Sequence, residues 1–143
     1  MSFTTGGTVR WMSPELLDPD RFGFADDRPT KQSDCYALGM VVYEVRAEAV
    51  IPTFANVRII YCQVLCGNHP YEDIRDWQLV ILRVLDGKRP QKPEAAERLG
   101  FAGGLWTVVE QCWAVDAGTR PDVRLVLSHL NHAARYWERR QLV

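Results

Sequence analysis

The chain has 143 residues, of which 47% are hydrophobic, and this is enough for one globular domain. Its 17 basic and 18 acidic residues give a net charge of −1, so composition excludes a strong electrostatic attraction to nucleic acid or to an anionic membrane. No apolar run is long enough to span a membrane, and 1–10 lacks the apolar core of a signal peptide. The four cysteines show no disulfide pattern, so we expect a cytoplasmic protein with reduced thiols.

The N-terminal part of the chain predicts loops around one short helix. Residues 1–10 are small and polar and are expected to form a loop. A short helix is expected at 13–17, because Pro14 suits the first turn of a helix. The polar stretch 18–30 is expected to lie on the surface.

Residues 31–45 predict the helix around which the domain is organised. After Asp34 only Gly39 and Glu44 interrupt the apolar run, so apolar side chains cover every side of this helix. That pattern is typical of a helix buried inside a domain. Ser33 and Asp34 supply the oxygen acceptors that a first helical turn needs, and we expect the helix to start there.

Two amphipathic helices are predicted further along the chain. The first covers about 76–86, with Asp76 as its N-cap and Gly87 as its end, and the second opens at 103–104. Between them, 88–93 is a basic loop bounded by prolines. We interpret it as a solvated connector, with contact to an acidic partner as the alternative. The apolar residues at helical spacing are Trp77, Val80, Ile81, Val84 and Leu85, then Leu105, Val108, Val109 and Cys112.

A last helix is predicted to start at Pro121 and Asp122. His129 and His132 on this helix are three residues apart, which would allow both to bind one metal ion. No cysteine or carboxylate set accompanies them, so exposed histidines are the preferred interpretation. The predicted apolar stripe consists of Val123, Val126, Leu127, Leu130, Ala134 and Trp137.

Four stretches, taken in order, resemble one protein family. They are GTVRWMSPE (7–15), SDCYALGMVVYEV (33–45), LCGNHPYEDI (65–74) and CWAVDAGTRPDV (112–123). Together they resemble the C-terminal lobe of a protein kinase, closest to the tyrosine-kinase-like group. The resemblance implies a mainly α fold, with 1–143 forming a partial kinase domain that starts late in the activation segment.

The resemblance also implies roles for individual residues. Ser2, Thr4 and Thr5 would lie where activation loops accept regulatory phosphate, although a frayed terminus is the preferred interpretation. Glu15 would form a buried ion pair with Arg120. Asp34 would hydrogen-bond the backbone of the catalytic loop, and Trp113 would be structural. The pocket for the residue after the phosphorylated one would be lined by Thr8, Val9, Arg10 and Trp11.

An insertion at about 46–64 interrupts the family pattern with 19 extra residues. Pro52 prevents a simple continuation of the preceding helix. The codons of Val45 and of 62–63 can supply the GT and AG ends of an intron, so 45–63 can be a translated intron. A genuine loop of this lineage is the alternative, and transcript sequencing distinguishes the two.

The catalytic motifs of the family do not occur in this sequence. There is no nucleotide-binding glycine-rich loop, strand lysine, HRD motif or DFG motif. We therefore expect the N-terminal lobe and the catalytic loop to be absent, and the chain to contain no catalytic, cofactor-binding or metal-binding residue. ATP and Mg²⁺ are expected only for the full-length family, which phosphorylates serine or threonine, with tyrosine as the alternative.

Three interpretations of function follow. The chain is part of a kinase that acts on a protein substrate, and is inactive by itself. Alternatively, it is a pseudokinase-like, non-catalytic helical module that binds a protein partner, or an unstable product without a role. In each case the central helix is expected to leave one apolar face uncovered, because elements upstream would normally cover it.

Overall fold

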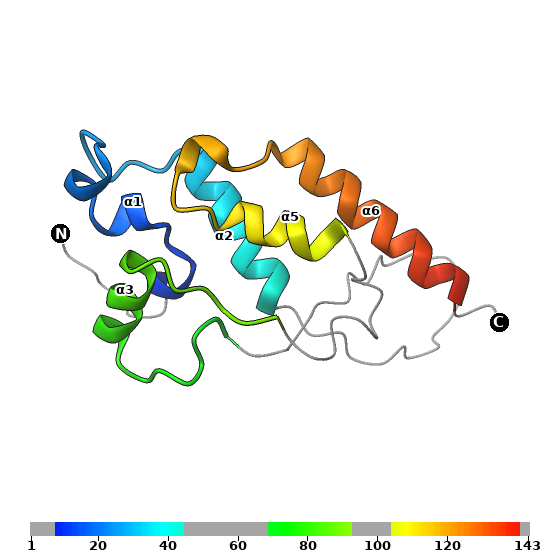
Figure 1. Ribbon diagram of the computed structural model, residues 1–143, viewed down its shortest axis with the longest axis horizontal. Coiled ribbons are helices and arrows are strands. Elements are labelled where there is room, and N and C mark those ends of the chain that lie inside the picture. Colours follow the sequence, from blue (N-terminus) through cyan, green and yellow to red (C-terminus); the bar gives the residue numbers. More distant parts are fainter. Residues whose placement is uncertain (1–7, 45–68, 93–103, 141–143) are drawn as a thin grey trace.

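The computed structural model describes residues 8–44, 69–92 and 104–140, and Figure 1 shows their arrangement. No strand occurs among these residues, so the predicted mainly α class is confirmed. No helix in the described ranges is long and apolar enough to cross a membrane. The elements are the 3-10 turns η1 (Thr8–Trp11), η2 (Asp20–Phe22) and η3 (Ala117–Thr119), and the helices α1 (Pro14–Leu17), α2 (Lys31–Glu44), α3 (Trp77–Leu85), α5 (Gly104–Cys112) and α6 (Val123–Arg140).

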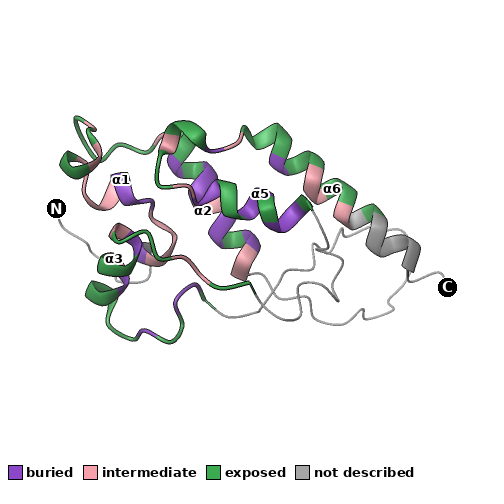
Figure 2. Cartoon of the chain, viewed as in Figure 1, coloured by how far each residue is buried: buried purple, intermediate pink, exposed green. Residues whose placement is uncertain are grey.

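Helix α2 lies in the middle of the fold. On one side of it are η1, α1 and α3, which contact one another, and on the other side α5 packs between α2 and α6 (Figure 1). Buried residues are concentrated along α2 and on the facing side of α5 (Figure 2). The predicted central position of this helix is therefore confirmed.

The start of α2 differs from the prediction. The helix begins at Lys31, and its cap is Thr30, whose Oγ1 accepts from the Ser33 amide at 3.1 Å. Ser33 Oγ in turn accepts from the Thr30 amide at 2.8 Å, which makes a reciprocal capping arrangement. Asp34, predicted as part of the cap, lies within the first turn and is exposed. The prediction was wrong for Asp34 because the oxygen that caps the first turn comes from Thr30, four residues earlier in the chain.

Burial along α2 is deep but not complete. Tyr36 and Met40 are fully buried, whereas Val41 is 42% exposed. The helix was predicted to be buried on every side, and this prediction was wrong for the side that carries Val41. The expectation of an uncovered apolar face on this helix stays a prediction, because Val41 is a single exposed position.

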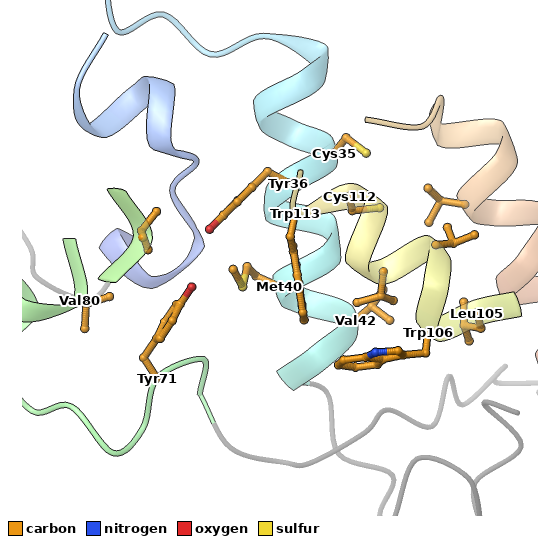
Figure 3. Close-up of a cluster of buried hydrophobic side chains, with 14 of the residues drawn as sticks. Cys35, Tyr36, Met40, Val42, Tyr71, Val80, Leu105, Trp106, Cys112 and Trp113 are labelled. Carbon is orange, nitrogen blue, oxygen red and sulfur yellow. The ribbon is translucent and has the colours of Figure 1, made fainter. Parts of the chain in front are cut away.

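The core is formed where α5 crosses α2 (Figure 3). A Cβ on Gly39 would lie 2.6 Å from Trp113 Nε1 and 2.8 Å from Cys112 Cβ, so only glycine permits this close crossing. Trp113 is 2% exposed and packs edge to face against Trp106 at 5.6 Å. Cys35 and Cys112 are buried free thiols, and burial raises the pKa of both, as is expected of reduced, unreactive cysteines.

Helix α3 agrees closely with the prediction. Asp76 is its N-cap and accepts from the Gln78 amide at 2.9 Å, and Gly87 follows its end with a φ of 72°. Val80 and Val84 are buried. The Asx-type cap and the glycine are both local signals, which is why the sequence located this helix well.

Helix α6 begins where it was predicted to begin, since Asp122 accepts from the Arg124 amide at 2.8 Å. Its buried side is narrower than the predicted stripe. Val126 is 1% exposed, but Val123 and Leu127 are 51% and 49% exposed. The prediction was wrong for Val123 and Leu127. The helix packs on α5 with the side that carries Val126, Leu130 and Ala133, which is rotated slightly about the helix axis from the predicted stripe. The side chains of Ala134 and Trp137 lie outside the described residues.

Several predictions concern residues that the structure does not describe. The insertion at 46–64 lies within 45–68, and Ser2, Thr4 and Thr5 lie within 1–7. The division of the chain into a partial kinase domain with an insertion therefore stays a prediction.

Candidate functional site

The segment 8–11, predicted to bind peptide substrate, forms η1 and packs beside α2 and α3. Val9 is 1% exposed, so it belongs to the core. Arg10 and Trp11 are half-buried. The side chain of Thr8 is outside the described residues. Among the described side chains of this segment, those of Arg10 and Trp11 are therefore the ones that reach the surface.

Arg10 contacts three backbone carbonyls of one turn. Its Nη1 donates to Pro70 O at 2.8 Å and to Tyr71 O at 2.5 Å, and its Nη2 donates to Ile74 O at 2.6 Å. Hydrogen bonds from a charged group are among the stronger ones in proteins. The turn 70–74 is thereby held against the segment 8–11, although more than 50 positions separate them in the chain.

Trp11 takes part in a second contact with the same region. Its Nε1 donates to Glu44 Oε2 at 2.9 Å, and the other carboxylate oxygen of Glu44 lies 2.7 Å from His69 Nδ1. The rings of Trp11 and His69 meet edge to face at 5.8 Å. The last residue of α2 and the first described residue after 45–68 are thus in contact with each other.

The pair of Glu15 and Arg120 lies at the other end of the segment. Two parallel hydrogen bonds join them, Nη1 to Oε1 at 2.6 Å and Nη2 to Oε2 at 2.8 Å, and their side chains are 2% and 0% exposed. Burial alone raises the pKa of the Glu15 carboxyl, but the hydrogen bonds and charge of Arg120 outweigh it, so the net pKa is lowered. Arg120 also donates to Gln32 O at 2.9 Å and Ala114 O at 3.0 Å.

A third arginine, Arg89, was missed by the sequence analysis. It donates from Nε to Trp113 O at 2.9 Å and from Nη1 to Val84 O at 3.0 Å. Its guanidinium and that of Arg120 each lie 5.2 Å from the centre of the buried Tyr36 ring. The interpretation of 88–93 as a solvated connector was therefore wrong for Arg89. It lies between Lys88 and Pro90 in a basic stretch, so only its tertiary contacts distinguish it from a surface arginine.

The remaining predicted residues are placed as follows. Asp34 is exposed near the start of α2, and its predicted partner, the backbone of a catalytic loop, is not among the described residues. Trp113 lies in the core. Among the described residues no group of three or more His, Cys, Asp or Glu could hold a metal ion. His132 is exposed and His129 is half-buried over Gly104.

The sequence is similar to those of known protein kinases. The model of the protein tyrosine and serine/threonine kinase family matches residues 3–130. A probable serine/threonine-protein kinase of Dictyostelium discoideum is 25% identical over 129 residues, which is 90% of this chain and 7% of that protein. Serine/threonine-protein kinase STY17 of Arabidopsis thaliana is 25% identical over 129 residues, which is 90% of this chain and 17% of that protein.

A third relative is named for a dual specificity. The dual specificity protein kinase splA of Dictyostelium discoideum is 23% identical over 124 residues, or 87% of this chain and 4% of its own length. The chain thus spans 17% or less of the length of these curated relatives.

Proposed function

Because this chain belongs to the protein tyrosine and serine/threonine kinase family, we propose that its helices form the substrate side of a kinase domain of the tyrosine-kinase-like group. That domain transfers the terminal phosphate of ATP to serine or threonine of a cytoplasmic protein substrate. The observation that carries the proposal is the family match over residues 3–130. The names of the relatives, which are serine/threonine or dual specificity kinases, support the reaction class.

The geometry of the segment 9–15 supports the same function. The segment is held at one end by Arg10 and at the other by the buried Glu15–Arg120 pair. Phosphoryl transfer depends mainly on positioning, so a rigid segment beside the peptide is a useful contribution to it. ATP and Mg²⁺ would be held by the glycine-rich loop and the HRD and DFG motifs, none of which this sequence contains. By itself the chain is therefore inactive in phosphotransfer.

A transcript read upstream of Met1 and across 45–64 tests this proposal. We expect an in-frame HRD and DFG upstream. The longer product should phosphorylate a generic protein substrate, its HRD Asp→Asn variant should not, and the 143-residue chain is the matched negative control. A stop codon directly upstream of Met1 in every transcript would contradict the proposal.

The alternative is a non-catalytic, kinase-derived helical module that binds a protein partner. It is favoured by the outer side of α3, where Leu79 and Leu82 are 51% and 56% exposed. The same transcript read separates the two functions, because a binding module does not need the catalytic motifs. A genuine start at Met1 would favour the module.

A further inference from the structure

The hydrogen bonds of Arg10 point to a role other than substrate binding. Its guanidinium is directed into the molecule, where it binds the carbonyl oxygens of Pro70, Tyr71 and Ile74 at 2.8, 2.5 and 2.6 Å. We infer that Arg10 is a positioning residue, which fixes the turn 70–74 beside the segment 8–11 and makes the two into one rigid surface.

The turn has a conformation that needs such support. Tyr71 has a φ of 57°, the left-handed region that residues other than glycine rarely adopt. Such a conformation persists only where the surrounding structure determines it, and it is often found at binding surfaces. Here Arg10 binds the Tyr71 carbonyl, the Tyr71 hydroxyl donates to Lys88 O at 2.9 Å, and Tyr71 as a whole is 7% exposed.

The geometry requires arginine and not positive charge alone. Nη1 donates to the carbonyls of Pro70 and Tyr71 at the beginning of the turn, and Nη2 donates to the carbonyl of Ile74 at its end. A planar guanidinium presents donors in fixed directions and can join both ends at once. A lysine ammonium is a compact donor at the end of a flexible chain and cannot span the turn in this way.

The neighbouring contacts extend the same unit. Val9 is buried in the core and Trp11 binds Glu44, which also contacts His69 just before the turn. The segment 8–11 therefore contacts the residues 69–74 at two places: Arg10 binds the turn 70–74, and Trp11 contacts His69 directly and through Glu44. That this joint surface receives the substrate peptide rests on the proposed function, whereas the positioning role of Arg10 does not.

Hydrogen exchange measured by NMR on the full 143-residue chain tests the inference. The Ile74 amide donates to Tyr71 O at 3.0 Å across the turn, so its exchange rate reports on turn closure. In Arg10→Gln this rate should rise about tenfold or more, the effect expected from losing a charge-assisted hydrogen bond. Amides of α5 should be unaffected. The matched control is Arg75→Gln, which removes an exposed arginine next to the same turn and should leave the rate unchanged.

Two further measurements separate positioning from a general effect on folding. Arg10→Lys should behave like Arg10→Gln, since charge without the planar group does not hold the turn. In the wild-type chain, the Nη groups of Arg10 should give separate signals, because three bonds to fixed carbonyls slow their rotation. Any one of three results would overturn the inference. They are wild-type protection of the Ile74 amide in Arg10→Lys, an unchanged exchange rate of that amide in Arg10→Gln, and averaged Nη signals of Arg10 in the wild type.

These measurements need neither ATP nor a peptide. If the transcript read finds no catalytic motifs but the exchange result is as expected, the proposed function fails and the positioning role stands. If the catalytic motifs are found but Ile74 exchange does not change, the positioning role alone fails.

Discussion

Three arginines determine how the distant parts of this chain meet. Arg10, Arg89 and Arg120 each bind carbonyl oxygens from another part of the fold, and Arg120 adds the carboxylate of Glu15. A buried charge is costly unless it is paired and its donors are used. At Arg120 the two hydrogen bonds to Glu15 and those to Gln32 O and Ala114 O meet this requirement.

Removing one partner of this pair should strongly destabilise the fold. Arg120→Ala leaves Glu15 buried and unpaired, which typically costs about 3–5 kcal/mol in the free energy of unfolding. Arg120→Lys keeps the charge but loses the parallel bonds, so it should be less stable than wild type as well. Urea unfolding followed by circular dichroism measures both variants.

The control for this experiment is Arg28→Ala. Arg28 pairs with Asp26 at 3.1 Å, but their side chains are 86% and 47% exposed. Loss of an exposed pair changes stability by less than about 1 kcal/mol. Equal effects of Arg28→Ala and Arg120→Ala would contradict the importance of burial.

The lowered pKa of Glu15 predicts a pH dependence of stability. A carboxyl whose pKa is lower in the folded state stabilises the protein above its unfolded pKa, and this contribution is lost as the pH falls through the folded pKa. The free energy of unfolding should therefore decrease as the pH falls below about 5. In Glu15→Gln this decrease should be smaller. An identical decrease in the variant would show that other carboxyls are responsible.

At the scale of elements, α2 lies between the two groups of helices and contacts both. Its last residue also contacts side chains that lie before and after it in the sequence. Gly39 permits the close crossing with α5, and Glu44 contacts both Trp11 and His69. The contact of Glu44 with His69 at 2.7 Å places the end of α2 beside the residue that precedes the turn 70–74. That 46–64 is an insertion stays a prediction.

Deleting 45–63 should therefore leave a folded protein. Shortening the connection between Glu44 and His69 from 24 to 5 residues should stabilise the fold by about 1.4 kcal/mol, since each doubling of the length of a flexible connection costs about 0.6 kcal/mol. Thermal unfolding measured by circular dichroism gives the change. Replacement of 45–63 by a Gly-Ser linker of equal length is the control and should resemble wild type. Loss of folding in both variants would show that the segment is an integral part of the domain.

At the scale of the whole molecule, large apolar side chains stay exposed on several helices. Val41 on α2 and Leu79 and Leu82 on α3 are 42%, 51% and 56% exposed. The helices pack as two groups around α2, and each group buries only the side that faces the centre (Figure 2). Exposed apolar surface of this kind favours association with itself or with a partner.

Polar substitution on α3 should reduce self-association. Leu79→Gln combined with Leu82→Lys removes two exposed apolar groups, and both new residues are good helix formers, so the helix itself should be retained. Sedimentation velocity should show concentration-dependent association of the wild type and less of it in the double variant. Arg83→Gln, an exposed polar change on the same helix, is the control. Equal association in all three proteins would exclude this surface.

The sequence by itself determined the family, the mainly α class and the helices whose ends carry local signals. Asp76 and Gly87 bounded α3, and Pro14 marked the start of α1, because caps and turns depend on residues within a few positions of one another. Only the tertiary structure showed which carbonyls bind Arg10, whose substrate contact stays a prediction, and Arg89, which was predicted to lie in a solvated connector. Their acceptors lie 64 and 24 positions away in the chain, and no pattern of neighbouring residues specifies where a guanidinium will find its carbonyls.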